Sequence, residues 1–251
     1  MILRTLLSLF EDAFFPLRCV LCEKNGELLC ASCAASLPRR SSQVCGFCGA
    51  RETPQGTLCH ECHSDNSSLD GIFAATRYDV LHIARLIHLF KYRFLRDLAE
   101  PLGHILSEAV LRSELPLPDL LLPVPLHPRR ERFRGWNQSL LLAEEMRKHF
   151  PEPIAPRVDP HLLNRIRFTA PQMSLRGRID RAQNIEGAFA LSPPPENKNE
   201  PEKNAFVDAR ILGKYVWLID DVAASGATLR ACADVLKKSG AKKVFGVVVA
   251  R

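Results

Sequence analysis

Hydrophobic residues are distributed differently in the two parts of the chain. From about residue 72 onward, short continuous apolar runs alternate with stretches in which apolar residues recur every three or four positions. The continuous runs predict buried strands, and the recurring pattern predicts amphipathic helices. Strands that alternate with helices favour a parallel sheet flanked by helices. The pattern therefore predicts an α/β domain over residues 72–251.

The clearest segments of this domain can be placed by number. Buried strands are predicted in DLLLPVPL (119–126), YVWLID (215–220) and AKKVFGVVVA (241–250). Helices are predicted over 80–111 with a bend at Pro101, over NQSLLLAEEMRKHF (137–150), and over ATLRACADVLKKSG (227–240) with Gly240 closing the last one. SPPPENKNEPEKN (192–204) is rich in proline and charge and holds no hydrophobic residue, which predicts a mobile insertion loop.

The N-terminal residues MILRTLLSLFEDAFFP are apolar, but Arg4, Glu11 and Asp12 interrupt them. The run is shorter than the roughly 20 residues that a membrane span needs, and no small-residue cleavage site follows it. We expect an amphipathic helix over residues 1–18. No other stretch is long enough to cross a bilayer, so the sequence predicts a cytoplasmic protein without a membrane span.

Residues 19–65 contain eight of the nine cysteines, arranged in four CxxC pairs. The pairs are Cys19 and Cys22, Cys30 and Cys33, Cys45 and Cys48, and Cys59 and Cys62. Repeated CxxC pairs ahead of a large domain are typical of tetrahedral zinc sites, whereas a redox CxxC usually occurs singly near a βαβ unit. The segment has few apolar residues, so we expect two structural zinc ions to stabilise a double zinc ribbon.

The spacing leaves two pairings of the cysteines open. In the compact pairing the first four cysteines bind one ion and the last four bind the other, and in a cross-brace the pairs interleave. His60 and His63 flank the last pair, and we expect them to be solvent-exposed because four thiolates already complete each site.

The net charge of +6 conceals an uneven distribution. Residues 1–70 hold six Lys and Arg against eight Asp and Glu, and each zinc bound by four thiolates adds further negative charge. Residues 126–184 hold twelve Lys and Arg against six Asp and Glu. An anion is therefore expected near the basic segment, although charge runs are often only solvated surface.

The stretch VWLIDDVAASGATLRA (216–231) joins a predicted strand to a predicted helix through a loop of small residues. Ligands of parallel sheets bind beyond the carboxyl ends of the strands, and amides at a helix N-terminus bind phosphate. We expect the acids to accept hydrogen bonds from sugar hydroxyls and the loop to hold a phosphate. The acids are Asp220 and Asp221, and the loop comprises Ala224, Ser225, Gly226, Ala227 and Thr228.

Competing nucleotide-binding motifs are missing from the sequence. It contains no GxxxxGK[ST], and no GxGxxG opens a helix after a predicted strand. The pattern of acids, small-residue loop and helix instead favours a sugar phosphate with free neighbouring hydroxyls.

The segment LIDDVAASGAT resembles the phosphoribosyl-diphosphate (PRPP) signature of type I phosphoribosyltransferases. The rest of the chain is similar, end to end, to the ComF family (ComFC or GntX-like) of amidophosphoribosyltransferase-like proteins. This similarity includes the double CxxC region, FKYR around Lys91, PVPLHPRRERFRGWNQS from Pro123, and RIRFTAPQMSLRGRIDRAQNIEGAF from Arg165. The resemblance implies a type I phosphoribosyltransferase-like sheet behind a zinc-ribbon domain.

The resemblance also implies roles for particular residues. Asp220 and Asp221 would hold the ribose hydroxyls of PRPP, and residues 224–228 its 5′-phosphate. Mg²⁺ would bind together with PRPP, and arginine-rich segments near 129–136 and 165–184 would close over the site. The loop from Leu126 to Arg130 would meet the pyrophosphate; its residues are Leu126, His127, Pro128, Arg129 and Arg130.

One departure from the family pattern bears on catalysis. Ala224 stands where the PRPP signature normally has a threonine and where purine-type transferases often carry an aspartate base. Alanine cannot abstract a proton, and the sequence identifies no substitute base.

The resemblance and the charges leave three functions open. The protein is a transferase with an unknown acceptor, a factor that handles DNA during natural transformation or DNA utilisation, or a PRPP sensor without catalysis. Single-stranded DNA, if bound, would follow the basic segment 126–184. The acidic ribbons would instead dock protein partners.

Overall fold

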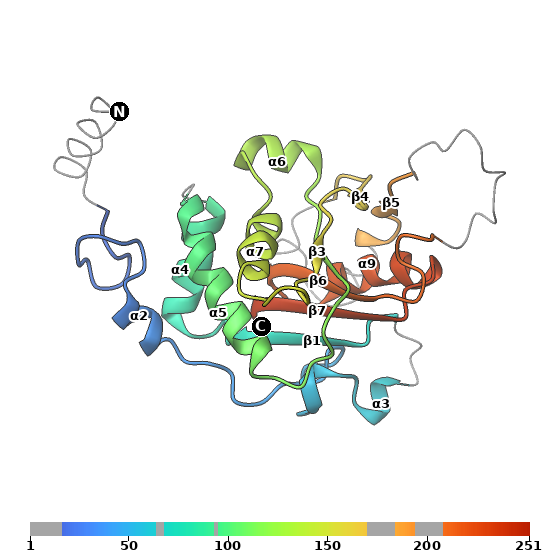
Figure 1. Ribbon diagram of the computed structural model, residues 1–251, viewed down its shortest axis with the longest axis horizontal. Coiled ribbons are helices and arrows are strands. Elements are labelled where there is room, and N and C mark those ends of the chain that lie inside the picture. The colour runs from blue at the N-terminus through green and yellow to red at the C-terminus, as the bar shows by residue number, and fades with distance from the viewer. Residues whose placement is uncertain (1–16, 64–67, 93–94, 170–183, 194–207) are drawn as a thin grey trace.

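The computed structural model describes residues 17–63, 68–92, 95–169, 184–193 and 208–251 (Figure 1). Its central sheet has five strands in the order β1-β7-β6-β2-β3, and all neighbouring strands are parallel. The strands are β1 (Gly71–Thr76), β2 (Leu120–Pro123), β3 (Arg157–Val158), β6 (Tyr215–Val222) and β7 (Lys243–Ala250). The predicted parallel α/β fold is confirmed.

Helices cover this sheet, and a small second sheet of two antiparallel strands, β4 and β5, lies beside it. The helices are α2 (Ala31–Ser36), α3 (His60–His63), α4 (Leu81–Tyr92), α5 (Ala99–Leu111), α6 (Pro128–Arg134), α7 (Gln138–Arg147) and α9 (Ala227–Lys238); the short turns are η1 (Pro54–Gly56) and η2 (Arg96–Leu98), and the small sheet comprises β4 (Leu163–Arg165) and β5 (Phe189–Leu191).

The central strands are buried on both faces, which explains their continuous apolar sequences. In β6, Trp217 and Ile219 belong to the hydrophobic cluster formed with α4, α5 and α7. Val216 and Leu218, which alternate with them, belong to the cluster formed with α9, β4 and β5. Because successive side chains of a strand point to opposite faces, a strand between two layers must be apolar at every position.

The helix predicted over 80–111 is two helices instead of one bent helix. α4 ends at Tyr92, and α5 begins at Ala99 after the short turn η2. Pro101 lies in the first turn of α5, where a backbone amide has no partner within the helix and proline is tolerated. The break therefore precedes the proline, and the bend predicted at Pro101 is wrong.

The two cysteine-rich segments attach to different parts of the sheet domain. Leu29 and Leu37 of the first segment belong to the hydrophobic cluster of α4 and α5. In the second segment, the Gln43 side-chain amide donates to the Ala74 carbonyl and accepts from the Ala74 amide, each at 3.0 Å. These bonds cover the free edge of β1. Figure 1 shows α2 beside α4 and α3 below β1.

Some sequence expectations concern residues outside this description. Residues 1–16 of the predicted N-terminal helix and residues 194–204 of the predicted insertion loop lie outside the described ranges. The division into a ribbon domain at 19–65 and a sheet domain at 72–251 stays a prediction. Within the described residues, every helix is too short or too polar to cross a membrane.

Candidate metal centres and ligand cavity

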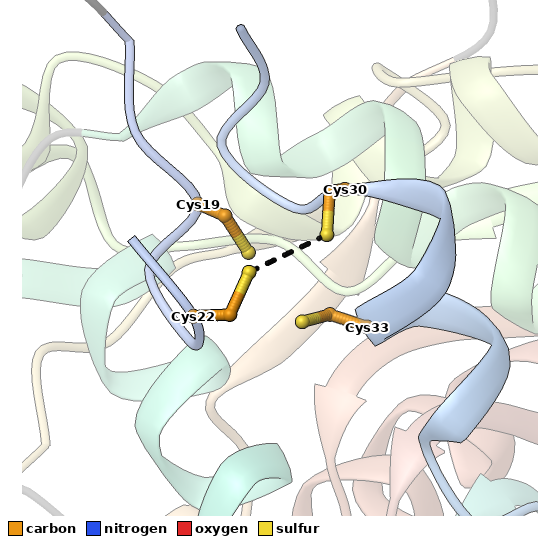
Figure 2. A group of neighbouring side chains, drawn as sticks. All are labelled: Cys19, Cys22, Cys30 and Cys33. Atoms are coloured by element: carbon orange, nitrogen blue, oxygen red, sulfur yellow. Dashed lines mark hydrogen bonds between the residues drawn. The ribbon is translucent and has the colours of Figure 1, made fainter. Parts of the chain in front are cut away.

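The eight cysteines of the CxxC pairs form two groups of four. Within each group the four Sγ atoms all lie within 4.8 Å of one another. Figure 2 shows the first group, in which a loop carries Cys19 and Cys22 while Cys30 and Cys33 come from the start of α2. The groups are Cys19, Cys22, Cys30 and Cys33, and Cys45, Cys48, Cys59 and Cys62. The compact pairing is confirmed, and the cross-brace alternative is wrong.

The sulfur positions fit a tetrahedral metal site. The Sγ atoms of Cys22 and Cys30 are 3.6 Å apart, and those of Cys48 and Cys59 are 3.9 Å apart. Zn–S bonds of about 2.3 Å place tetrahedral thiolates about 3.8 Å apart, whereas a disulfide needs about 2 Å. Both groups are therefore suited to structural zinc ions.

Backbone amides prepare one cysteine of each group for metal binding. Burial raises the pKa of Cys19, but the amides of Cys30 and Cys22 outweigh it and lower that pKa to about 6. Burial likewise opposes the amides of Cys59 and Cys48 at Cys45, and its pKa is also lowered to about 6. The thiolate is the form that binds a metal, so these amides favour the ligand state.

A cavity of about 370 Å³ lies beyond the carboxyl ends of β2 and β6. Residues from α4, α6, α7, β4 and both strand ends meet there, although they are far apart in the sequence. Its lining comprises Lys91, Tyr92, Val124, Pro125, Leu126, Arg130, Phe133, Arg134, Gln138, Ser139, Arg165, Asp220, Asp221, Val222 and Thr228. The predicted acid pair thus shares one cavity with two residues of the predicted pyrophosphate loop.

Both acids already have protein partners. Lys91 Nζ is 2.8 Å from Asp221 Oδ1, and this ion pair is largely buried. Asp220 Oδ1 accepts from the Ser139 hydroxyl at 3.0 Å and from the Asp221 amide at 2.9 Å. Burial, and after it the charge of Asp221, raises the pKa of Asp220 to about 7. A ligand that uses Asp221 must bind its second oxygen or displace Lys91.

The side chains at the start of α7 reach the acids because the N-cap residue of this helix, Asn137, is fixed to the end of β2. Asn137 caps α7 by accepting from the Ser139 amide at 3.0 Å. Its amide nitrogen donates to the carbonyl of Val124, just past β2, at 3.1 Å. This cap holds Gln138 and Ser139 beside the carboxyl ends of the strands.

The loop after β6 has the backbone conformation that its glycine predicts. Gly226 has φ 70°, in the left-handed region, and α9 begins at the next residue. Among the described hydrogen bonds, the amides of Ala224, Ser225 and Gly226 donate to no protein carbonyl. The Ala227 amide donates to the Ser225 hydroxyl oxygen at 3.4 Å. This hydroxyl oxygen therefore stabilises the turn. Three of the five predicted phosphate-binding amides therefore remain available.

Only two of the five residues predicted to meet the pyrophosphate line the cavity. Leu126 and Arg130 line the cavity, whereas Pro128 begins α6. The ring of His127 packs edge-on against Phe168 at 5.0 Å, and the Arg129 guanidinium lies 5.5 Å from the centre of the same ring. Burial, and then the charges of Arg129 and Arg165, lower the pKa of His127.

Two residues of the cavity were not identified individually from the sequence. Arg165 Nε and Gln138 Nε2 are buried donors without a partner in the described part of the chain, and both side chains line the cavity. Burial, and then Arg130, lower the pKa of Arg165 to about 10. A buried donor without an acceptor is costly, so both atoms indicate a site for oxygen atoms of a ligand. The arginine-rich pattern marked the region of Arg165, but nothing in the sequence marked Gln138.

A second cavity, of about 700 Å³, lies between residues 39–55 and α5. Both of its arginines from residues 39–40 have protein partners, since Arg39 pairs with Glu108 at 2.9 Å and Arg40 donates to the backbone carbonyl of Arg251 at 3.2 Å. It is larger than the cavity beside the acids, but it holds no buried donor without a partner among the described residues. We therefore assign the candidate ligand site to the smaller cavity.

Both the cysteine-rich segment and the sheet domain are similar to known proteins. A family model described as "Double zinc ribbon domain" matches residues 10–63. The chain is 29% identical over 241 residues to competence protein F of Haemophilus influenzae, covering 92% of this chain and 95% of that protein. The resemblance to the ComF family is confirmed.

Relatives in other bacteria extend this result. The DNA utilization protein YhgH of Salmonella typhi is 28% identical over 220 residues, which cover 86% of this chain and 87% of that protein. The competence protein ComFC of Bacillus subtilis is 25% identical over 223 residues, covering 86% of this chain and 81% of that protein. This chain is thus homologous to ComF-family proteins over both the ribbons and the sheet.

Proposed function

We propose that this protein binds PRPP in the cavity beyond β2 and β6 and works in DNA uptake or DNA utilisation. The observation that supports PRPP most is the pair of buried donors without partners, Arg165 Nε and Gln138 Nε2, in the cavity that also contains the acid pair. A ligand rich in anionic oxygens would satisfy these donors and would be attracted by the cations Lys91 and Arg130.

The parts of PRPP match different parts of the cavity and of the loop after β6, of which only Thr228 lines the cavity. The free amides of residues 224–226 and the start of α9 suit the 5′-phosphate. Asp220 and Asp221 suit the ribose hydroxyls, and Arg130 and Arg165 suit the diphosphate. The Mg²⁺ that accompanies PRPP would find its hard oxygen ligands in these carboxylates, and it would supply positive charge to the diphosphate leaving group.

If the protein is an enzyme, the proposed reaction is the transfer of the phosphoribosyl group of PRPP to an unidentified acceptor. Breaking the bond to the diphosphate leaves positive charge on the sugar, and the arginines would stabilise the departing anion. PRPP sensing without catalysis is the alternative, and one observation favours it. Ala224 is exposed at the position where a base would stand and has no group that can accept a proton.

Isothermal titration with PRPP and Mg²⁺ tests ligand binding. Wild type should bind saturably, and the double variant Asp220→Asn/Asp221→Asn should lose binding. Asp208→Asn, which removes a partly buried carboxylate paired with Arg210 at another place, is the matched control and should bind as wild type does. Absence of saturable binding by wild type contradicts the proposal. Pyrophosphate release with candidate bases then separates transferase from sensor.

The role in DNA uptake or utilisation is supported by the similarity to proteins named for competence and DNA utilisation and by the surface of α6. Phe133 and Phe168 expose 75% and 49% of their surface, respectively, and the guanidinium groups of Arg129 and Arg130 lie near the Phe168 ring. Aromatic rings among arginines are the surface on which single-stranded bases stack. Single-stranded DNA would therefore follow the described part of the basic segment 126–184.

A salt titration tests the DNA proposal. Affinity for an oligodeoxythymidine should fall with salt, with a slope of about −0.7 for each neutralised phosphate. The variant Phe133→Ala/Arg129→Ala should bind more weakly and show a shallower slope than wild type. Lys238→Ala, which removes an exposed cation at the far end of α9, is the control. Binding that is indifferent to salt and unchanged in Phe133→Ala/Arg129→Ala contradicts the proposal.

The ribbons have a separate role in this proposal. Their two zinc ions would be structural, and their acidic surface would dock protein partners instead of DNA. We place the protein in the cytoplasm, where PRPP and incoming single strands would both be present.

A further inference from the structure

The predicted phosphate loop lies directly against the second zinc ribbon. A Cβ atom added at Gly226 would be 2.7 Å from Ile72 Cδ1 and 3.5 Å from the carbonyl oxygen of Gly46. Gly46 follows Cys45, which belongs to the second group of four cysteines. The turn that begins α9 is therefore in close contact with the loop that contains the first CxxC pair of that group.

Arg230 connects the same two segments through its side chain. Its Nη1 donates to the carbonyl of Ser225 at 2.9 Å, and its guanidinium carbon lies 4.9 Å from the centre of the Phe47 ring. Phe47 stands between the metal-ligand candidates Cys45 and Cys48. One guanidinium group thus contacts both the phosphate loop and the aromatic residue of the metal-binding loop.

The hydrogen bond from Arg230 to the Ser225 carbonyl orients the whole peptide group between Ser225 and Gly226. In a planar trans peptide, the C=O of Ser225 and the N–H of Gly226 point in opposite directions. Holding the carbonyl toward Arg230 therefore directs the Gly226 amide away from it. That amide is one of the three that donate to no protein carbonyl in the described residues. Arg230 accordingly determines the orientation of an amide assigned to the 5′-phosphate.

The metal-binding loop is itself held firmly to the sheet. Arg251, just past the end of β7, donates from Nη1 to the Cys45 carbonyl at 3.0 Å. A Cβ atom added at Gly46 would be only 2.8 Å from the backbone nitrogen of Ile72, so this loop lies close to β1. Phe47 is consequently a fixed support for the guanidinium of Arg230.

The first ribbon has a different environment. Leu21 occupies the position in its CxxC loop that Phe47 occupies in the second, and it packs against the hydrophobic cluster of α4 and α5. The contacts of Arg230 with Ser225 and with Phe47 lie at the phosphate loop and the second ribbon. Leu21 is therefore the matched control position for Phe47.

We propose that Arg230 is a positioning residue through which the second zinc ribbon fixes the phosphate-binding loop, an inference that rests on the proposed function. The zinc would hold the loop of Cys45 and Cys48, the Phe47 ring would hold the guanidinium, and the guanidinium would hold the Ser225 carbonyl. Disturbing any of these steps lowers affinity for a sugar 5-phosphate without changing a group that contacts it.

The test compares four variants with wild type in the full-length zinc-loaded protein. Phe47→Leu removes the aromatic face, and Arg230→Met removes the guanidinium. Phe47→Trp and Arg230→Lys retain an aromatic face and a cation, respectively. Leu21→Ala is the control in the first ribbon. Each protein is measured for zinc content, for ribose 5-phosphate affinity, and for amide hydrogen exchange of the peptide covering residues 223–229.

Phe47→Leu and Arg230→Met should retain two zinc ions, exchange the 223–229 amides faster and bind ribose 5-phosphate about five-fold more weakly. Phe47→Trp and Arg230→Lys should recover most of the affinity, and Leu21→Ala should resemble wild type. A purely structural role of Phe47 and Arg230 would instead lower stability in the four variants at these positions without this pattern of rescue. If Phe47→Leu loses zinc, Arg230→Met, which lies outside the ribbon, decides the outcome.

The outcomes separate this inference from the proposed function. If wild type does not bind ribose 5-phosphate or PRPP, the proposed function fails, while faster exchange in both disruptive variants still establishes the coupling. If wild type binds and Arg230→Met binds equally well with unchanged loop exchange, the coupling is overturned and the proposed function stands.

Discussion

The cysteine groups and the ligand cavity are constructed in opposite ways. Each cysteine group takes its four sulfur atoms from no more than 18 consecutive residues, and the spacing of two CxxC pairs brings them together. The cavity takes Lys91 from α4, Ser139 from α7, Arg165 from β4 and Asp220 from β6. A metal can organise a local segment, whereas a cavity of this kind requires the sheet to be complete.

This difference predicts how the two sites respond to mutation. Removing one ligand of a local metal site should release the ion and unfold its short segment. Removing one residue of the cavity should leave the sheet folded but leave charges or donors without partners. The following predictions test this contrast, from the largest expected effect to the smallest.

The largest effect is expected for the second cysteine group. Cys45→Ser should reduce the zinc content from two ions per chain to one, because a structural zinc contributes about 10 kcal/mol to the folding of its segment. Metal analysis and limited proteolysis within residues 45–62 measure this loss. Cys232→Ala, which replaces the buried cysteine on α9, should retain both ions. If Cys45→Ser still contained two zinc ions per chain, the contrast between the local cysteine groups and the cavity built from distant segments would be contradicted.

Next in size is the ion pair at the cavity. Lys91→Met should lower the free energy of unfolding by about 2–3 kcal/mol, because it leaves the buried Asp221 carboxylate without its cation. Urea unfolding measures the change. The double variant Lys91→Met/Asp221→Asn should lose less than the two single variants together. Additive losses would mean that the pair does not act as a unit.

The pH dependence of Asp220 is the third test. Its pKa is raised from an ordinary 3.8 to about 7, so between these values the folded state binds more protons than the unfolded state. Its contribution to stability is therefore lost as the pH rises through this window. Asp220→Asn should gain stability relative to wild type from pH 4 to pH 7, by an amount on the order of 2 kcal/mol.

A carboxylate shifted in the opposite direction provides the control. The side chain of Arg210 lowers the pKa of Asp208, so its contribution is present above pH 4 and is lost only at more acidic pH. The difference between Asp208→Asn and wild type should therefore stay constant from pH 4 to pH 7. A constant difference for Asp220→Asn as well would show that Asp220 titrates as an ordinary carboxyl group.

The smallest effect is expected at Ser139. Ser139→Ala removes the hydroxyl that donates to Asp220 and should lower the free energy of unfolding at pH 7 by about 1 kcal/mol. It should also move the pH window of Asp220 upward, because this hydrogen bond lowers the pKa of Asp220. A variant that matches wild type in both stability and pH window would exclude Ser139 from the support of the acid pair.

Much of the fold could be predicted because the sequence patterns that indicate helices and strands lie within a few consecutive residues. The strands at β2, β6 and β7 and the helices α7 and α9 follow from apolar runs, periodicity and Gly240. β1 was missed because GIFAAT is short and follows directly on the cysteine-rich segment. The break before α5 was misplaced because Pro101 suggested a kink, although a first-turn proline disturbs nothing.

The candidate ligand site divides in the same way. Asp220, Asp221 and Thr228 were singled out because they are close together in the sequence, and Arg130 through the arginine-rich segment; these residues line the cavity, whereas Ala224 to Ala227 of the predicted phosphate loop do not. Gln138 could not be found, because a glutamine at the start of a helix has no distinguishing pattern. Its importance arises only from burial beside the ends of strands that lie elsewhere in the chain.

The sequence by itself determined the four CxxC pairs as candidate metal ligands, the parallel α/β class and the strand, loop and helix around Asp220, because neighbouring residues carry all of these signals. The grouping of the CxxC pairs into two sets of four came from the structure. Only the tertiary structure decided that the ribbons attach to different parts of the domain, that Lys91 pairs with Asp221, and that Arg230 joins the second ribbon to the phosphate loop. These contacts join residues far apart in the chain, and their formation depends on the packing of the whole sheet.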